Sequence, residues 1–467
     1  MRIFRHTLAP GAAPGMVIDL LLCFAALVLA ASSLTHRYAT IHTVNVPELP
    51  LILVGATIFA FVMALMYAIV GLYRPAPISA VSAAGRTVFA VVVGGYITSL
   101  SLRTVADRGY IEQLLPAAIA YLVIGLVFVR GGMVMMRRVA ALPRVLIIGT
   151  GPEALALAHD LKTTRRNGRD VIGMYPAMVD AEVPASTDCG LRVFSRGHSI
   201  TDLVSRHGVH EIIVAVREQR GGGVPMDELL ACRIRGIPVM DLAAYTESAR
   251  HEVPIDSLKG SWLVYGHGFV QGHVRQALKR AFDILSSSVL LVLLSPVMLL
   301  AAIAIKFDSR GPVLYRQERV GLAGRSFMCT KFRSMRIDAE KDGVARWASK
   351  NDPRVTRMGS FLRKSRIDEL PQLWSVFTGE MSLVGPRPER PAFVEALKEQ
   401  IPFYEIRHTV KPGITGWAQV RYHYGASMDD ARRKHQFDLY YVKNNSLVLD
   451  LLVLVETVSV IVFREGQ

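Results

Sequence analysis

The chain has 467 residues, of which 51% are hydrophobic and 20% are charged, and its mean hydropathy is +0.31. This composition is too apolar for an ordinary soluble protein, so membrane segments and charged soluble regions must occupy different stretches of the sequence. The net charge of +15 suits anionic lipids and phosphorylated substrates. It argues against nucleic acid, because no nucleic-acid-binding motif accompanies the basic regions.

Four apolar stretches come first, over residues 16–34, 51–72, 87–102 and 114–129. A bilayer core of about 30 Å requires about 20 helical residues, so these stretches predict four transmembrane helices within residues 1–142. Because further spans follow the first, we do not expect a cleaved signal peptide at the N-terminus.

The charges and cysteines of the chain indicate where its soluble parts lie. Most arginines of the first region share a side of the membrane with the N-terminus, so the positive-inside rule places everything after Arg130 in the cytoplasm. Cys23, Cys189, Cys232 and Cys329 lie far apart and form no CxxC pair. This spacing argues against a zinc site or a disulfide framework and fits a reducing compartment.

Residues 143–258 alternate short apolar stretches with helical ones. An apolar strand at residues 145–148 precedes a Gly-Thr-Gly turn at 149–151 and a helical run, the order found in dinucleotide-binding folds. Strands near residues 171–174 and 211–216 continue the alternation, so we predict a Rossmann-like α/β domain. A single glycine motif is weak support for a bound nucleotide. We therefore favour a degenerate domain that keeps the turn for packing, and leave nucleotide binding open.

The third region, residues 271–467, begins with another apolar stretch, part of a predicted helix over residues 278–306. Proline removes a helical hydrogen bond, so we expect a break at Ser295-Pro296, with the Ser295 hydroxyl satisfying a freed carbonyl. A straight crossing would put the following basic region outside, against the charge rule. We therefore predict a re-entrant helix that bends at Ser295-Pro296 and returns to the cytoplasmic side.

Three acidic residues in apolar surroundings bear on how these segments meet the membrane. Asp283 lies near the start of the re-entrant helix, where we expect it at headgroup depth or paired with a base. The final apolar stretch, residues 447–463, carries Asp450 and Glu456. A full span remains open, but these acids favour a helix that lies in the membrane interface.

The densest cluster of candidate catalytic and binding residues lies between positions 315 and 419, around the adjacent carboxylates Asp368 and Glu369. One interpretation is structural: Asp368 caps a helix over residues 369–377 that Gly379 ends. This role is compatible with chemistry, because a helix N-terminus also favours phosphate. Basic segments on both sides of the pair are candidates to bind phosphate, and they cover residues 315–321, 331–335, 351–359 and 385–389.

Six short motifs, taken together and in order, resemble the bacterial sugar transferase family, the monotopic polyprenyl-phosphate sugar-1-phosphate transferases. They cover residues 279–283, 295–296, 331–335, 368–373, 385–388 and 411–417. The resemblance extends from about residue 276 to the C-terminus. The preceding four helices and degenerate α/β domain resemble the large form of the family, which initiates exopolysaccharide synthesis. The implied fold is membrane α plus α/β, with a C-terminal, mostly α catalytic domain that contains the re-entrant helix.

The resemblance also implies a reaction and a location. The expected enzyme sits in the bacterial inner membrane among its lipids, with a cytoplasmic catalytic domain, and uses Mg²⁺. It transfers hexose-1-phosphate from a UDP-sugar to undecaprenyl phosphate and releases UMP. Glucose is the expected hexose, with galactose next, and the expected oligomer is a homodimer.

In the implied mechanism, Asp368 attacks the β-phosphate and forms an aspartyl-phosphosugar, a reasonable role for a carboxylate nucleophile. Asp368 and Glu369 are the implied magnesium ligands, and Glu369 could instead orient the lipid phosphate. The side chains implied to hold phosphates and neutralise developing charge are Arg316, Lys331, Arg333, Arg363 and Arg387.

Two other functions are weighed against this one. A membrane-bound nucleotide-sugar dehydratase or epimerase needs a tyrosine with a lysine four residues later. None of the fifteen tyrosines has such a neighbour, since Lys443 follows Tyr440 by three. A non-catalytic scaffold would predict lost carboxylates, whereas Asp368 and Glu369 are both present.

Overall fold

The computed structural model describes residues 2–3, 6–7, 12–38, 48–73, 80–103, 108–139, 142–163, 169–177, 190–216, 224–255, 268–269, 272–337, 339, 352–422, 425 and 427–463. The chain forms two compact units, one of Met1–Val134 with His267–Gln467 and the other of Met135–Gly266. The finer division of the chain at residues 142, 258 and 271 stays a prediction.

Four long apolar helices follow a short antiparallel pair of strands, β1 (Arg2–Ile3) and β2 (His6–Thr7). The helices are α1 (Ala12–Tyr38), α2 (Leu49–Ile69), α3 (Ala80–Leu102) and α4 (Arg108–Val139). Within the described residues these helices and α10 are long and apolar enough to cross a membrane. The four apolar stretches expected from the sequence are therefore confirmed as helices.

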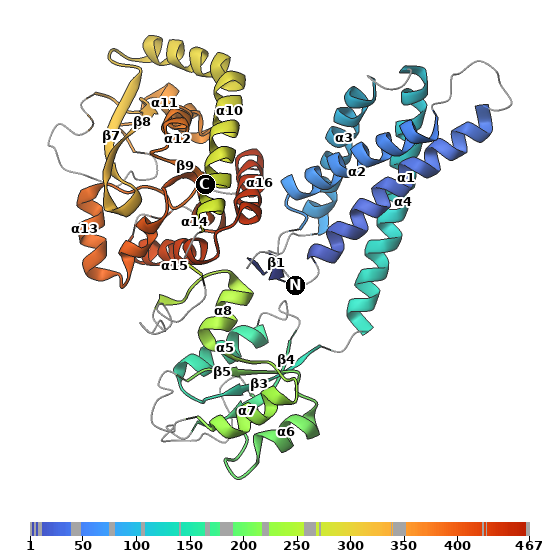
Figure 1. Cartoon of the computed structure of the whole chain (residues 1–467), viewed down its shortest axis with the longest axis vertical. Coiled ribbons are helices and arrows are strands. Elements are labelled where there is room, and N and C mark those ends of the chain that lie inside the picture. Colours follow the sequence, from blue (N-terminus) through green and yellow to red (C-terminus); the bar gives the residue numbers. More distant parts are fainter. Residues whose placement is uncertain are drawn as a thin grey trace. The chain divides into compact units, whose positions relative to one another are not determined.

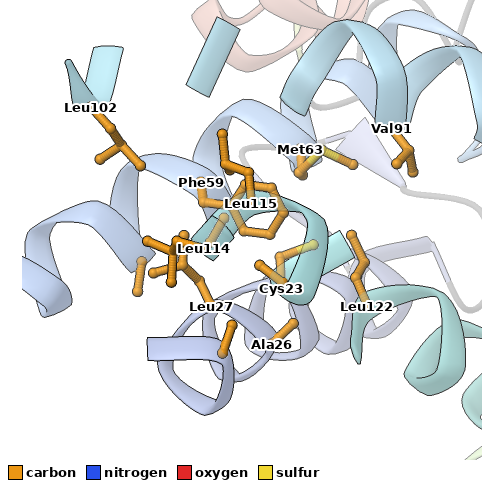
Figure 2. Close-up of a cluster of buried hydrophobic side chains, with 14 of the residues drawn as sticks. Cys23, Ala26, Leu27, Phe59, Met63, Val91, Leu102, Leu114, Leu115 and Leu122 are labelled. Atoms are coloured by element: carbon orange, nitrogen blue, oxygen red, sulfur yellow. The ribbon is translucent and has the colours of Figure 1, made fainter. Parts of the chain in front are cut away.

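The helices α1 to α4 share one core of buried apolar side chains. Figure 2 shows Cys23 and Leu27 of α1 facing Phe59 of α2 and Leu115 of α4 within this cluster. Each of these side chains has lost nearly all of its exposed surface. Because lipid tails are as apolar as these side chains, close packing rather than expulsion of water must hold such helices together.

The unit Met135–Gly266 is an α/β region. Four strands among its described residues form a parallel sheet in the order β4-β3-β5-β6. The strands are β3 (Arg144–Ile148), β4 (Asp170–Tyr175), β5 (Glu211–Val214) and β6 (Val239–Asp241), and the helices are α5 (Pro152–Thr163), α6 (Ile200–His207), α7 (Met226–Ile234) and α8 (Leu242–Arg250). The three expected strands are confirmed, and β6 was not expected. Alternate residues of β3 enter separate cores, as a sheet covered on both faces requires.

The glycine turn after β3 has a packing role. Gly149 has a φ of 117°, and a Cβ at this position would lie 2.7 Å from the Ala215 carbonyl oxygen. The turn thus needs glycine to let the ends of β3 and β5 approach each other. This agrees with the expectation that the turn serves packing; the Rossmann-like assignment stays a prediction.

The second part of the other unit begins with α10 (His273–Asp308), which contains the predicted helix 278–306. Pro296 lies inside it, and the Ser295 hydroxyl donates to the Val292 carbonyl oxygen at 2.8 Å. Val292 is the residue whose carbonyl Pro296 leaves without an amide donor, so the expected use of Ser295 is confirmed. Figure 1 shows α10 bending, with its last turns running at an angle toward β7.

The rest of this part is mostly helical, as the family resemblance implied. It contains an antiparallel hairpin of β7 (Leu314–Val320) and β8 (Ser326–Phe332) and a parallel pair of β9 (Ser382–Val384) and β10 (Gly413–Thr415). The helices are η3 (Leu322–Gly324), α11 (Arg357–Lys364), η4 (Ile367–Glu369), α12 (Gln372–Thr378), α13 (Pro391–Gln400), η5 (Tyr404–Thr409), α14 (Trp417–Arg421), α15 (Met428–Asn444) and α16 (Leu447–Phe463).

The acidic residues in the apolar helices are bonded within the protein. Asp283 of α10 is buried and accepts hydrogen bonds from the Ser382 hydroxyl and the Leu383 amide, both at 3.1 Å, rather than from a base. In α16, Asp450 accepts from Lys279 at 2.7 Å. Glu456 forms an ion pair with Arg421 of α14, at 2.8 Å. Pairing of this kind makes burial of the acids tolerable, so the acids alone do not locate α16 relative to the membrane.

Three glycines allow β9 and β10 to approach each other closely. A Cβ on Gly413 would overlap the Gly385 amide nitrogen, and a Cβ on Gly416 would overlap the Gly385 carbonyl oxygen. A Cβ on Gly385 would in turn overlap the Lys411 carbonyl oxygen. Only glycine fits at these positions, because the obstacles are rigid backbone atoms.

Replacing Gly413 with alanine should therefore separate β9 from β10 and destabilise the protein by about 1–3 kcal/mol, the usual cost of overpacking. Thermal unfolding of the purified protein in detergent measures this loss. Gly272→Ala is the matched control, because nothing lies within 4 Å of a Cβ there. Equal stability of the two variants would contradict the packing argument.

Candidate active site

Asp368 is a buried carboxylate without the structural role that its sequence position suggested. It lies in η4, and α12 begins only at Gln372, with Pro371 at the N-cap position and no side-chain cap. The expectation that Asp368 caps this helix is therefore wrong, although Gly379 does end it, with a φ of 98°. Asp368 is 8% exposed, and its Oδ1 atom has no hydrogen-bond partner within the described residues.

Glu369, the next residue, differs from Asp368 because one of its oxygens accepts two hydrogen bonds. Its Oε1 atom accepts from Lys331 Nζ at 2.8 Å and from Arg387 Nη2 at 2.7 Å. Lys331 comes from β8 and Arg387 from the loop after β9, so two separate parts of the domain meet at this carboxylate. The structure thus brings together four of the residues selected from the sequence.

The two carboxylates differ in their electrostatics. Burial raises the pKa of Asp368 to about 6, and the negative charge of Glu369 adds to this effect, against the opposing influence of Lys331 and Arg387. Burial would also raise the pKa of Glu369, but Arg387 and Lys331 hold that pKa well below its usual range. Glu369 is thus firmly ionised, whereas Asp368 gains or loses its proton near pH 6.

In the described part of the chain, the remaining three predicted phosphate-binding residues make no bond to this pair. Arg333 is buried, and its guanidinium donates to the Ser309 and Arg310 carbonyl oxygens, which fastens the chain that leaves α10. Arg316 is exposed on β7, and Arg363 is half-buried at the end of α11. Their binding of phosphate stays a prediction.

Two residues near the pair were given no role from the sequence. Arg366 adopts a left-handed backbone conformation, with a φ of 59°, and its charge lowers the pKa of both carboxylates. Gln372 is 3% exposed, and its Nε2 donor has no hydrogen-bond partner within the described residues. Both lie within four positions of Asp368, and this closeness in the sequence is the feature that could have identified them as candidate site residues.

The residues present fit a magnesium ion that arrives with phosphate, but not an all-protein cage. No group of three or more His, Cys, Asp or Glu side chains gathers in the part of the chain that the structure describes. Magnesium commonly uses one or two carboxylates and takes its other ligands from water and substrate phosphates. Asp368 Oδ1 is available as such a ligand, whereas Glu369 Oε1 already accepts from two cations.

The opposite pKa shifts predict opposite stability effects. A raised pKa means that the folded protein holds the Asp368 proton more tightly, so its contribution to stability falls as pH rises from about 4 through about 6. Asp368→Asn should therefore stabilise the protein at about pH 7.5, by on the order of 1–3 kcal/mol, and by less near pH 4.

Glu369→Gln is the matched control for that variant. The lowered pKa of Glu369 contributes stability above its unfolded value, so removing the charge should cost about 2–3 kcal/mol at the same neutral pH. Thermal unfolding at the two pH values measures both effects. Shifts of the same sign at neutral pH would contradict the electrostatic description.

Comparison with known proteins gives a consistent result. The bacterial sugar transferase family matches residues 274–464. The chain is 44% identical over 238 residues to a UDP-N-acetylgalactosamine-undecaprenyl-phosphate N-acetylgalactosaminephosphotransferase of Aeromonas hydrophila, covering 51% of this chain and 55% of that protein. It is 44% identical over 187 residues to a UDP-glucose:undecaprenyl-phosphate glucose-1-phosphate transferase of Escherichia coli (strain K12), covering 40% of each. The chain thus spans about half or less of these two relatives.

A third relative is similar over most of its length. It is a UDP-glucose:undecaprenyl-phosphate glucose-1-phosphate transferase of Xanthomonas campestris pv. campestris, 31% identical over 361 residues. The alignment covers 75% of this chain and 73% of that protein, so it reaches well beyond the part that contains Asp368 and Glu369. On these similarities, the chain belongs to the bacterial sugar transferase family.

Proposed function

We propose that this protein transfers a hexose-1-phosphate from a UDP-sugar to undecaprenyl phosphate and releases UMP, as the initiating step of exopolysaccharide synthesis. The observation that carries the proposal is the buried Asp368, whose Oδ1 atom has no hydrogen-bond partner among the described residues, beside a Glu369 that two cations hold ionised. The printed activities of the relatives supply the substrate classes.

The proposed reaction has two steps. An Asp368 oxygen attacks the β-phosphorus, an oxygen–phosphorus bond forms, and the bond from this phosphorus to the bridging oxygen breaks, so UMP leaves with that oxygen. A phosphate oxygen of undecaprenyl phosphate then attacks the same phosphorus, and the Asp368–phosphorus bond breaks to restore the carboxylate. A pKa of about 6 leaves Asp368 largely ionised at neutral pH, which is the form that a nucleophile requires.

Neighbouring residues have distinct roles in this scheme. Lys331 and Arg387, held by Glu369, place positive charge where the transferred phosphate would sit, and such fixed charges stabilise phosphoryl transfer. Glu369 orients these cations rather than attacking. Asp368, with Glu369 nearby, would hold magnesium, which would supply further positive charge to the diphosphate.

We also propose where the protein works and in what form. The bend in α10 and the Ser295–Val292 bond support a re-entrant helix whose two ends face the cytoplasm, at the bacterial inner membrane. Glucose is the proposed hexose, which two of the relatives described above carry in their names. A degenerate Rossmann-like domain and a homodimer complete the proposal.

The covalent step is tested with donor alone. Purified protein given UDP-glucose and Mg²⁺, without acceptor lipid, should release UMP once and gain the mass of a phosphohexose on the peptide that contains Asp368. Asp368→Asn should show neither signal, with turnover reduced by at least about 10⁴-fold, as expected when a nucleophile is lost. Glu369→Gln, which keeps the nucleophile, should still form some adduct. An unmodified wild-type protein that nonetheless transfers sugar phosphate would contradict the two-step scheme.

The re-entrant helix is tested by labelling. In a protein whose native cysteines are replaced by serine, Arg310→Cys places a thiol in the exposed chain just after α10. An impermeant maleimide should fail to label it in intact cells and should label it after lysis. Arg103→Cys, between α3 and α4, is the control on the predicted outer side and should react in intact cells. Labelling of both thiols in intact cells would show that α10 crosses the membrane.

A further inference from the structure

The loop that presents Arg387 to Glu369 is fixed along its whole backbone. We call residues 385–389 the Arg387 loop. Each carbonyl oxygen from residue 386 to residue 389 accepts one hydrogen bond. In chain order the donors are the Gly413 amide at 3.0 Å, Arg407 Nη2 at 2.8 Å, Arg319 Nη1 at 3.0 Å and the Val320 amide at 2.9 Å. Two of these donors are arginine side chains.

Arg407 is itself fixed by hydrogen bonds to neighbouring side chains. It is 5% exposed, and both Nε and Nη2 donate to Asp438 Oδ2, at 3.2 and 2.8 Å. Its Nη1 atom donates to the Tyr404 hydroxyl at 2.8 Å. Every nitrogen of this guanidinium is therefore bonded inside the domain, so Arg407 is not available to bind a substrate.

The Arg387 side chain needs such support. It is 33% exposed, so water competes for its guanidinium, and a long side chain near solvent otherwise samples many rotamers. Its contact with Glu369 is 2.7 Å long, and a backbone displacement of about 1 Å would break it. The Arg407 bond acts on the backbone of Arg387 itself, the closest point from which a neighbour can control this geometry.

We propose that Arg407 is a positioning residue, which together with Asp438 fixes the Arg387 loop so that Arg387 reaches Glu369. Arg319 supports the same loop through its bond to the Pro388 carbonyl oxygen. The proposal rests on the proposed function, because it assigns Arg407 an effect on transfer that acts only through Arg387.

The test is a double-mutant cycle on the full-length protein, with UMP release from UDP-glucose and undecaprenyl phosphate as the assay. Arg407→Gln is combined with Asp438→Asn, so that neither partner is left as a buried unpaired charge. This pair should lower kcat/KM by about 10- to 100-fold, as loss of a supporting shell does. When Arg387→Gln is already present, the same pair should lower kcat/KM by less than about threefold, because the residue on which it acts is gone.

The matched control is Arg421→Gln with Glu456→Gln. It neutralises another largely buried arginine–carboxylate pair, 2.8 Å apart, which joins α14 to α16. This control pair should change kcat/KM by the same factor whether or not Arg387→Gln is present. The proposal would be overturned if the Arg407 pair variant also lowered kcat/KM by the same factor with and without Arg387→Gln, or if it left kcat/KM unchanged.

Two further measurements cover the remaining outcomes. If the Arg407 pair variant does not fold, Arg319→Gln removes the bond to Pro388 and leaves the Arg407–Asp438 pair intact, and it should show the same dependence on Arg387. Hydrogen exchange of the peptide that spans the Arg387 loop needs no turnover. It should become faster in either variant and not in the control. A wild-type protein without UMP release would contradict the proposed function, whereas unchanged exchange would contradict the positioning role.

Discussion

The ion pairs of Glu369 with Lys331 and Arg387 are the interaction on which the site depends. A carboxylate as buried as Glu369 is tolerable only when its charge is compensated and its oxygen is bonded. The adjacent Asp368 is also buried and lies beside the negative charge of Glu369, so the pKa of Asp368 rises. Two residues that follow one another in the sequence thereby acquire opposite properties, since the pKa of Glu369 is lowered and the pKa of Asp368 is raised.

The same site is joined to the membrane helix through its backbone. The first half of α10 carries Lys279, Arg280 and Asp283. Lys279 Nζ donates to the Val384 carbonyl oxygen at 3.2 Å, and Arg280 donates to the last carbonyls of α12. Asp283 accepts from β9, which leads directly into the Arg387 loop. These bonds connect the helix to the residues around Glu369, a useful arrangement for the proposed transfer to a lipid phosphate.

Local chemistry explains where reasoning from the sequence succeeded and where it failed. The bond of Ser295 to the carbonyl left by Pro296 was predictable, because donor and acceptor are three residues apart. The capping role of Asp368 was wrong because Asp368 lies inside a short 3₁₀ turn and Pro371 is the residue at the N-cap of α12. Arg333 lies in a basic motif typical of phosphate binding, yet its donors are used to fasten the chain after α10. A motif identifies a donor, but only its neighbours in space decide which acceptor it meets.

The sequence by itself determined the apolar helices, the alternating strands of the α/β region and the selection of Asp368, Glu369, Lys331 and Arg387, because hydropathy, periodicity and side-chain chemistry are local properties. Tertiary structure decided which carboxylate stays ionised, how closely β9 and β10 approach, and that Arg407 supports a loop twenty residues away. These features depend on burial and on distances between segments far apart in the chain. No local pattern encodes them.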